Sequence, residues 1–144
     1  MHLGRLALAA TVAMVMIAAD QLTKTAAVRH LGDRPARSTS PSRLALVRNE
    51  RAGIGRLTVP RTASLVVCLA TVAVAMTLVT LTDEIPIVAA LGLGAAIGGG
   101  VGNCADLLIR GDIVDFIRIG HWPVFNLADV ALTVGVGLTV WGML

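Results

Sequence analysis

The stretch IPIVAALGLGAAIGGGVGNCAD (residues 85–106) is apolar almost throughout and ends in NCAD, which carries an asparagine and an aspartate. As a helix it would be about 33 Å long at 1.5 Å per residue, enough to cross a hydrocarbon core of roughly 30 Å. Gly94, Gly98 and Gly102 recur every four residues, so they share one helix face and permit close packing against a second helix. The stretch therefore predicts a membrane-spanning helix with a polar end.

Three further apolar segments occupy residues 6–19, 63–81 and 124–144. The first is short, and a signal peptide is the alternative reading, but IAA at 17–19 is a poor cleavage site and a helix extended to about residue 28 would span. With 56% hydrophobic and 15% charged residues, the 144-residue chain lies far from the composition of soluble domains. The sequence predicts an all-α integral membrane protein, a single domain of residues 1–144 with four transmembrane helices at about 6–28, 62–81, 85–106 and 124–143.

Two polar segments, about residues 29–61 and 107–123, separate these helices, and each contains a run that favours a strand. The runs are LALV at 44–47 and IVDFIRI at 113–119, which are rich in branched and aliphatic side chains. Each polar segment is therefore expected to contain a short strand.

Nine of the twelve Lys and Arg residues fall between Lys24 and Arg61. Such clustering indicates a surface that meets anionic lipid headgroups rather than nucleic acid, since nothing else in the chain resembles a nucleic-acid module. The positive-inside rule would place this segment in the cytoplasm.

Metal and cofactor sites are not indicated by the cysteines or histidines. Cys68 and Cys104 lie in apolar runs without CxxC spacing, so they are interpreted as small apolar core residues. His2, His30 and His121 have no mutual spacing typical of a metal site.

The motif Asn-x-Ala-Asp occurs twice, as NCAD at 103–106 and NLAD at 126–129. One copy ends a predicted helix and the other lies near the start of the next. Because consecutive antiparallel helices share the loop between them, the two motifs must lie at similar membrane depth, where two carboxylates can meet. In each copy the asparagine is three residues before the aspartate, hence on the same helix face.

Two carboxylates in a low-dielectric site tend to share a proton, so that one acts as base and the other as acid. Hydrolysis of a peptide bond by an activated water needs this pair of roles. The alternative for Asp129 is a helix-capping role, which its place in a first helical turn allows. For Asp106 the helix dipole argues against capping, because a carboxylate is disfavoured at a helix C-terminus.

Asp20 and Lys24 are spaced i, i+4, which by itself indicates an ion pair that stabilises the first helix at the membrane interface. Asp115 lies in the second polar segment, as either a solvated charge or a contact that holds this segment over the site. Ionisable residues within membrane spans are costly, and they usually mark function.

Taken together, DQLTK at 20–24, GNCAD at 102–106 with GDIVDF at 111–116, and FNLAD at 125–129 resemble the ordered motifs of the lipoprotein signal peptidase family, also called signal peptidase II. The resemblance runs from about residue 20 to the C-terminus. It implies a four-helix, multi-pass aspartic peptidase of the bacterial plasma membrane. In such a protein the external loops form a small β-like cradle, and the active site lies near the external face. Members cut prolipoproteins just before the lipid-modified cysteine.

The resemblance also implies roles for particular residues. Asp106 and Asp129 would be the catalytic pair. Support of the site and its substrate would fall to Asp20, Lys24, Asn49, Asn103, Arg110, Asp115 and Asn126. We expect no cofactor and no metal, lipid-modified prolipoproteins and membrane lipids as partners, and a monomer.

The chain departs from the family pattern at two places. Leu107 stands where the family has an arginine that holds the substrate backbone, and Arg110, one turn further, is the candidate substitute. Of the family's external Asn-x-Gly-Ala-Ala-Phe segment only Asn49 matches securely. Two alternatives therefore stay open: a family member that binds precursors or an inhibitor without cleaving, and a small proton or ion relay in which the carboxylates carry ions.

Overall fold

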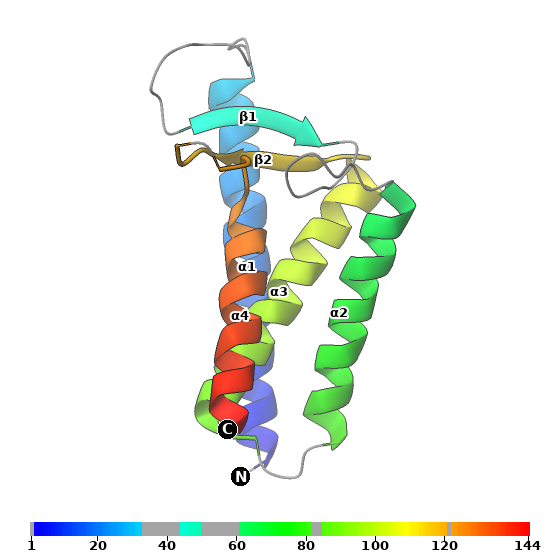
Figure 1. Ribbon diagram of the computed structural model, residues 1–144, viewed down its shortest axis with the longest axis vertical. Helices are drawn as coiled ribbons and strands as arrows, with labels where there is room; N and C mark the ends of the chain where they lie inside the picture. The colour runs from blue at the N-terminus through cyan, green and yellow to red at the C-terminus, as the bar shows by residue number, and fades with distance from the viewer. Residues whose placement is uncertain (1, 33–43, 50–60, 82–84, 121) are drawn as a thin grey trace.

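The computed structural model describes residues 2–32, 44–49, 61–81, 85–120 and 122–144. This part of the chain forms four helices and one two-stranded sheet (Figure 1). The elements are, in chain order, α1 (His2–Leu31), β1 (Leu44–Asn49), α2 (Arg61–Leu81), α3 (Ile87–Ile109), β2 (Ile113–Ile117) and α4 (Leu127–Met143). His121 lies outside the described residues.

All four predicted helices are present in the described chain, and two of them are long and apolar enough to cross a membrane by length and composition. These two are α1, over Leu3–Leu31, and α3, over Ile87–Ile109. The apolar stretches of the other two helices, Cys68–Leu78 in α2 and Leu127–Met143 in α4, are shorter. That all four helices span a membrane stays a prediction.

Helix boundaries differ from the predicted ones at the ends that carry the polar motifs. Helix α3 begins after Pro86 and continues three residues beyond Asp106, so this aspartate lies in the last turn rather than at the helix end. Helix α4 begins at Leu127 rather than at 124, because Asn126 caps it and Phe125 is still extended. Phe125 forms a bridge with Ile117 at the end of β2.

Helix α3 is the central element, because it packs against α1, α2 and α4. Glycines permit this close approach: a Cβ atom on Gly98 would lie 2.8 Å from the carbonyl oxygen of Ala13 in α1, and one on Gly99 would collide with the carbonyl oxygen of Ala128 in α4. The packing role predicted for the glycines of residues 85–106 is confirmed. Helix α2 stands at the edge of the bundle against α3 (Figure 1).

Strands β1 and β2 are antiparallel, with Val47 opposite Asp115 and Asn49 opposite Ile113. Phe116 packs on Ala27 and Leu31 of α1, and this small core attaches the sheet to the helices. The sheet lies across one end of the bundle, and both chain termini lie at the other end (Figure 1). The predicted sheet-like cradle is therefore present, and it closes the end of the bundle where the polar motifs lie.

Large apolar side chains cover the outside of the described bundle. Trp122 and Trp141 are 75% and 69% exposed near the two ends of α4, as expected of aromatic residues at membrane interfaces. Exposed aliphatic residues also lie on the two helices with shorter apolar stretches, namely Val66, Leu69, Val74, Val134, Val136 and Val140. An exterior with so many large apolar side chains suits a bilayer rather than water.

Candidate active site

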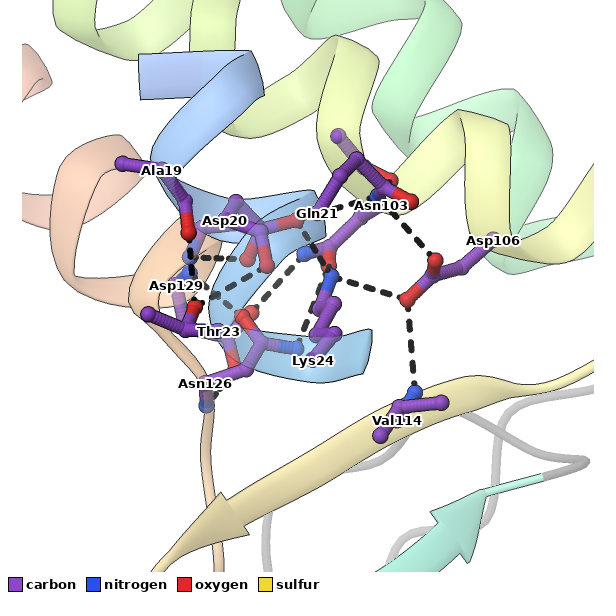
Figure 2. Close-up of polar contacts among 12 residues, drawn as sticks. Ala19, Asp20, Gln21, Thr23, Lys24, Asn103, Asp106, Val114, Asn126 and Asp129 are labelled. Atoms are coloured by element: carbon purple, nitrogen blue, oxygen red, sulfur yellow. Dashed lines mark hydrogen bonds and ion pairs between the residues drawn. The ribbon is translucent and has the colours of Figure 1, made fainter. Parts of the chain in front are cut away.

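Lys24 lies at the centre of a buried polar network beneath the sheet (Figure 2). Its ammonium lies 2.7 Å from Oδ2 of Asp20, one turn earlier in α1, and 2.8 Å from Oδ2 of Asp106 in α3. It also donates a hydrogen bond to Oδ1 of Asn103 at 3.0 Å. An ammonium has three donors, and these contacts use all three. The i, i+4 pair predicted at a membrane interface is therefore a fully buried pair that joins α1 to α3.

Asp106 is completely buried, and its carboxylate accepts from four neighbours. Oδ1 of Asp106 contacts the Arg110 guanidinium and accepts a hydrogen bond of 3.1 Å from Nε2 of Gln21. Lys24 contacts Oδ2, which also accepts from the backbone N–H of Val114 at 3.4 Å. A carboxylate offers about four lone-pair sites. The neighbours of Asp106 therefore occupy its acceptor capacity, and they connect α1, α3 and β2.

Asp20 connects α1 to the start of α4. Its Oδ1 accepts a hydrogen bond of 2.9 Å from the backbone N–H of Ala128, one of the free donors in the first turn of α4. A carboxylate at this place is favourable because helix N-termini carry partial positive charge. Gly102 lies directly against this carboxylate, and a Cβ atom there would be 2.8 Å from Oδ2 of Asp20.

Asn126 and Asp129 form a reciprocal capping box at the start of α4. The backbone N–H of Asp129 donates to Oδ1 of Asn126 at 2.9 Å, and that of Asn126 donates to Oδ2 of Asp129 at 3.1 Å. The capping alternative considered for Asp129 is therefore realised. The same carboxylate also faces the network, because its Oδ1 accepts from Nδ2 of Asn103 at 2.9 Å.

Asp115 approaches from β2 and is 5% exposed. Nδ2 of Asn126 donates to Oδ1 of Asp115 at 2.8 Å and lies 3.2 Å from Oδ1 of Asn103. Asn126 therefore touches two carboxylates, Asp115 through its side chain and Asp129 through the capping box. This arrangement brings a strand residue and a helix residue to the same asparagine.

Eight of the nine predicted site residues meet in this one network. They are Asp20, Lys24, Asn103, Asp106, Arg110, Asp115, Asn126 and Asp129. Asn49 ends β1, and its side chain lies outside the described part of the structure. The sequence interpretation missed Gln21, which donates to Asp106 and to the Gly102 carbonyl oxygen. These two partners lie in α3, and no local spacing signals them.

Within the described residues, no three His, Cys, Asp or Glu side chains converge as a metal-binding group. The network instead consists of carboxylates, amides and two cations under the sheet. Its residues come from α1, the C-terminal end of α3, β2 and the start of α4. A sequence model of the family described as signal peptidase (SPase) II matches residues 12–144 of the chain. The chain belongs to the signal peptidase II family.

Curated members of the family are similar over most of this chain. A lipoprotein signal peptidase from Shouchella clausii is 38% identical over 136 residues, 92% of this chain and 90% of that protein. One from Brevibacillus brevis is 34% identical over 132 residues, 88% of each chain. A solved structure described as a bacterial membrane enzyme superposes with a TM-score of 0.77 over 94% of this chain and 92% of that one, at 23% identity, and therefore shares the fold.

Membership of the signal peptidase II family makes the chain a bacterial membrane protein and a protease of lipoprotein processing. Leu107 is one of the two places where the chain departs from the family pattern, and Arg110 is the candidate substitute for the missing arginine. Leu107 is completely buried one turn beyond Asn103 on α3. The Arg110 side chain is 28% exposed, contacts Asp106 and reaches Oγ1 of Thr25 on α1 at 3.4 Å.

Proposed function

We propose that this signal peptidase II is an aspartic endopeptidase that removes signal peptides from diacylglyceryl-modified prolipoproteins, with cleavage just before the lipidated cysteine. The names of the similar proteins support the substrate class. One observation carries the aspartic mechanism: Asn126 contacts two carboxylates, Asp115 and Asp129, at the sheet-covered end of the bundle. Paired carboxylates serve an acid–base hydrolysis of a peptide bond by water.

In this proposal all four helices cross the bacterial plasma membrane, and the sheet lies at the external surface. The position of the network at one end of the bundle, opposite both termini, supports a site near one membrane face (Figure 1). The cluster of basic residues between Lys24 and Arg61 argues for the inverse orientation. A reporter enzyme that is active only outside the membrane, fused near residue 40, is expected to be active, and a silent reporter would reverse the orientation.

The identity of the catalytic pair is also a proposal. The pair Asp106 and Asp129, predicted from the repeated motif, stays a prediction. The contacts favour Asp115 as the partner of Asp129, because the acceptor sites of Asp106 are already occupied by Arg110, Gln21, Lys24 and a backbone N–H. A carboxylate so occupied has no position left for a water molecule or a substrate carbonyl. In this proposal Asp106 holds the side chains of Lys24, Gln21 and Arg110 in place and does not touch the substrate.

The mechanism follows from this pair. One of the two carboxylates, Asp115 or Asp129, accepts a proton from a water molecule that attacks the scissile carbonyl carbon. The other carries the shared proton and protonates the carbonyl oxygen, and the leaving nitrogen is protonated as the tetrahedral intermediate collapses. Asn126 and Asn103 hold the carboxylates by hydrogen bonds, so the pair is oriented before substrate arrives.

Arg110 is proposed as the residue that receives the substrate main chain. It is a partly exposed cation that touches the network, and its guanidinium has donors beyond the one that contacts Asp106. Leu107 has no polar group for such a role. A substrate carbonyl that meets Arg110 would lie near Thr25 of α1, which Arg110 already reaches.

The deciding experiment uses protein reconstituted in liposomes with a diacylglyceryl-modified prolipoprotein, and measures release of the signal peptide. We expect Asp115→Asn and Asp129→Asn each to lower the cleavage rate by about 10³-fold, within the range typical of a lost general acid or base. Their unfolding midpoints should stay near that of the native protein. Asp106→Asn is the matched control, in which the midpoint falls strongly because Lys24 and Arg110 lose their shared anion.

The cleavage rates and unfolding midpoints of these variants together identify the two catalytic carboxylates. A folded Asp106→Asn protein without activity, beside an active Asp115→Asn protein, would restore the pair predicted from the repeated motif. Full activity in Asp129→Asn would remove the dyad from the mechanism. Precursor binding by the native protein without cleavage would favour the non-catalytic family member, a function that the buried Leu107 motivates.

A further inference from the structure

Thr25 of α1 has a half-buried hydroxyl group to which the proposed mechanism gives no role. This hydroxyl donates a hydrogen bond of 2.7 Å to the carbonyl oxygen of Gln21, one turn earlier in the helix. A threonine hydroxyl has one proton and two acceptor lone pairs. Because the proton is directed to Gln21, the hydroxyl acts toward its other neighbours as an acceptor. Nη2 of Arg110 donates to it at 3.4 Å.

The guanidinium of Arg110 is thus held at two of its nitrogens. Nη1 contacts Oδ1 of Asp106, one turn earlier along the chain, and Nη2 donates to Thr25 on a different helix. The guanidinium is planar and rigid, so contacts at two nitrogens fix the direction in which it faces. The contact with Asp106 alone would leave the plane able to turn. These two contacts leave three of its five N–H donors for other partners.

Gln21 connects the two groups that hold the guanidinium. Its Nε2 donates to the same Oδ1 of Asp106 at 3.1 Å, and its backbone carbonyl oxygen accepts from Thr25. A β-branched side chain in a helix has few χ1 rotamers, and a hydrogen bond to the carbonyl four residues earlier selects one of them for threonine. The acceptor that α1 offers to Arg110 is therefore already oriented in the protein without substrate.

We infer that Thr25 is a positioning residue for substrate binding: its hydroxyl holds the Arg110 guanidinium so that the remaining donors meet main-chain carbonyl groups of the signal peptide. The inference rests on the proposed function, in which Arg110 receives the substrate main chain. An arginine side chain loses much rotamer freedom when it is fixed in a complex. Because Thr25 restricts this freedom before substrate arrives, less free energy is lost on binding. The hydroxyl should therefore affect binding rather than the chemical step.

Thr25→Val removes the hydroxyl and keeps the branched shape of the side chain. In liposomes with a diacylglyceryl-modified prolipoprotein, we expect this variant to fold and to raise KM about three- to tenfold with an unchanged kcat. Thr25→Ser keeps the hydroxyl and should restore most of the native KM. Thr11→Val is the matched control and should keep the native KM. Thr11 is an exposed threonine of α1 that donates the same kind of hydrogen bond, at 2.8 Å to the carbonyl oxygen of Ala7.

A double variant shows whether Thr25 acts through Arg110. In an Arg110→Ala background, Thr25→Val should leave KM unchanged, because the hydroxyl no longer has a guanidinium to hold. A general structural role of Thr25 would persist in that background, so an equal rise of KM there would overturn the inference. So would a native KM in Thr25→Val or a fall in kcat alone. A lower KM would overturn it as well, since the hydroxyl would then compete with substrate for the guanidinium.

Equilibrium binding separates this inference from the proposed function. In an Asp129→Asn background the precursor is expected to stay intact, and the Kd of a fluorescently labelled precursor can be measured by anisotropy. Adding Thr25→Val should raise this Kd about three- to tenfold. Native protein that cleaves nothing would refute the proposed function, and the Kd values would still decide the role of Thr25. Equal Kd values with and without the hydroxyl, or no binding at all, would overturn the inference.

Discussion

Replacing Lys24 with methionine removes one ammonium and keeps an unbranched side chain in its place. The ammonium now lies between two buried carboxylates, 2.7 Å from Asp20 and 2.8 Å from Asp106. Asp106 retains Arg110 after the change, whereas Asp20 retains only neutral donors, the Gln21 amide and a backbone N–H. The substitution therefore leaves chiefly one buried anion without its cation.

Breaking a buried ion pair by removing one partner typically costs about 3–5 kcal/mol, and we expect Lys24→Met to lower the free energy of unfolding by about that much. Removing both partners is close to neutral by the same reasoning, so Lys24→Met with Asp20→Asn should recover at least half of the loss. Arg29→Met is the matched control, because Arg29 is an exposed cation on the same helix. Its expected effect is within about 1 kcal/mol.

The assay is unfolding in mixed micelles with a rising fraction of sodium dodecyl sulfate, followed by circular dichroism. A loss below about 1 kcal/mol for Lys24→Met would refute the central role of this ammonium, since that is the range of an exposed pair. Absence of recovery in the double variant would show that Asp20 is not the anion left unpaired.

Two other substitutions test single contacts of the site in the same micelles and in the cleavage assay. Gly102→Ala puts a Cβ atom 2.8 Å from Oδ2 of Asp20 and should lower the free energy of unfolding by about 1–3 kcal/mol. Gly137→Ala is its control, because a Cβ atom at Gly137 would meet no atom within 4 Å. This change should raise the free energy of unfolding by up to about 1 kcal/mol. Asn126→Ser keeps an oxygen that can cap α4 and loses the amide that contacts Asp115. We therefore expect α4 to stay folded while the cleavage rate falls at least about tenfold. An unchanged cleavage rate would show that this amide does not orient Asp115 and Asp129.

Much of the fold follows from local pattern. Apolar runs of helical length and the strand-like runs at 44–47 and 113–119 predicted the elements, and the two Asn-x-Ala-Asp motifs predicted four residues of the network. The family resemblance implied the site roles of the other four, Asp20, Lys24, Arg110 and Asp115. The elements could be predicted because burial and backbone hydrogen bonding within one element depend on neighbours in sequence. The start of α4 could not, since the Asn126 cap and the bridge of Phe125 to β2 decide it.

The sequence by itself determined that this chain forms apolar helices with carboxylates and asparagines at the ends of two of them, and that its motifs resemble those of signal peptidase II. Only the tertiary structure decided how these groups pair. The donors to Asp106 come from α1, the end of α3 and β2. Hydrogen-bond partners so far apart in sequence leave no periodic signal, because their meeting depends on how whole helices pack rather than on spacing along one of them.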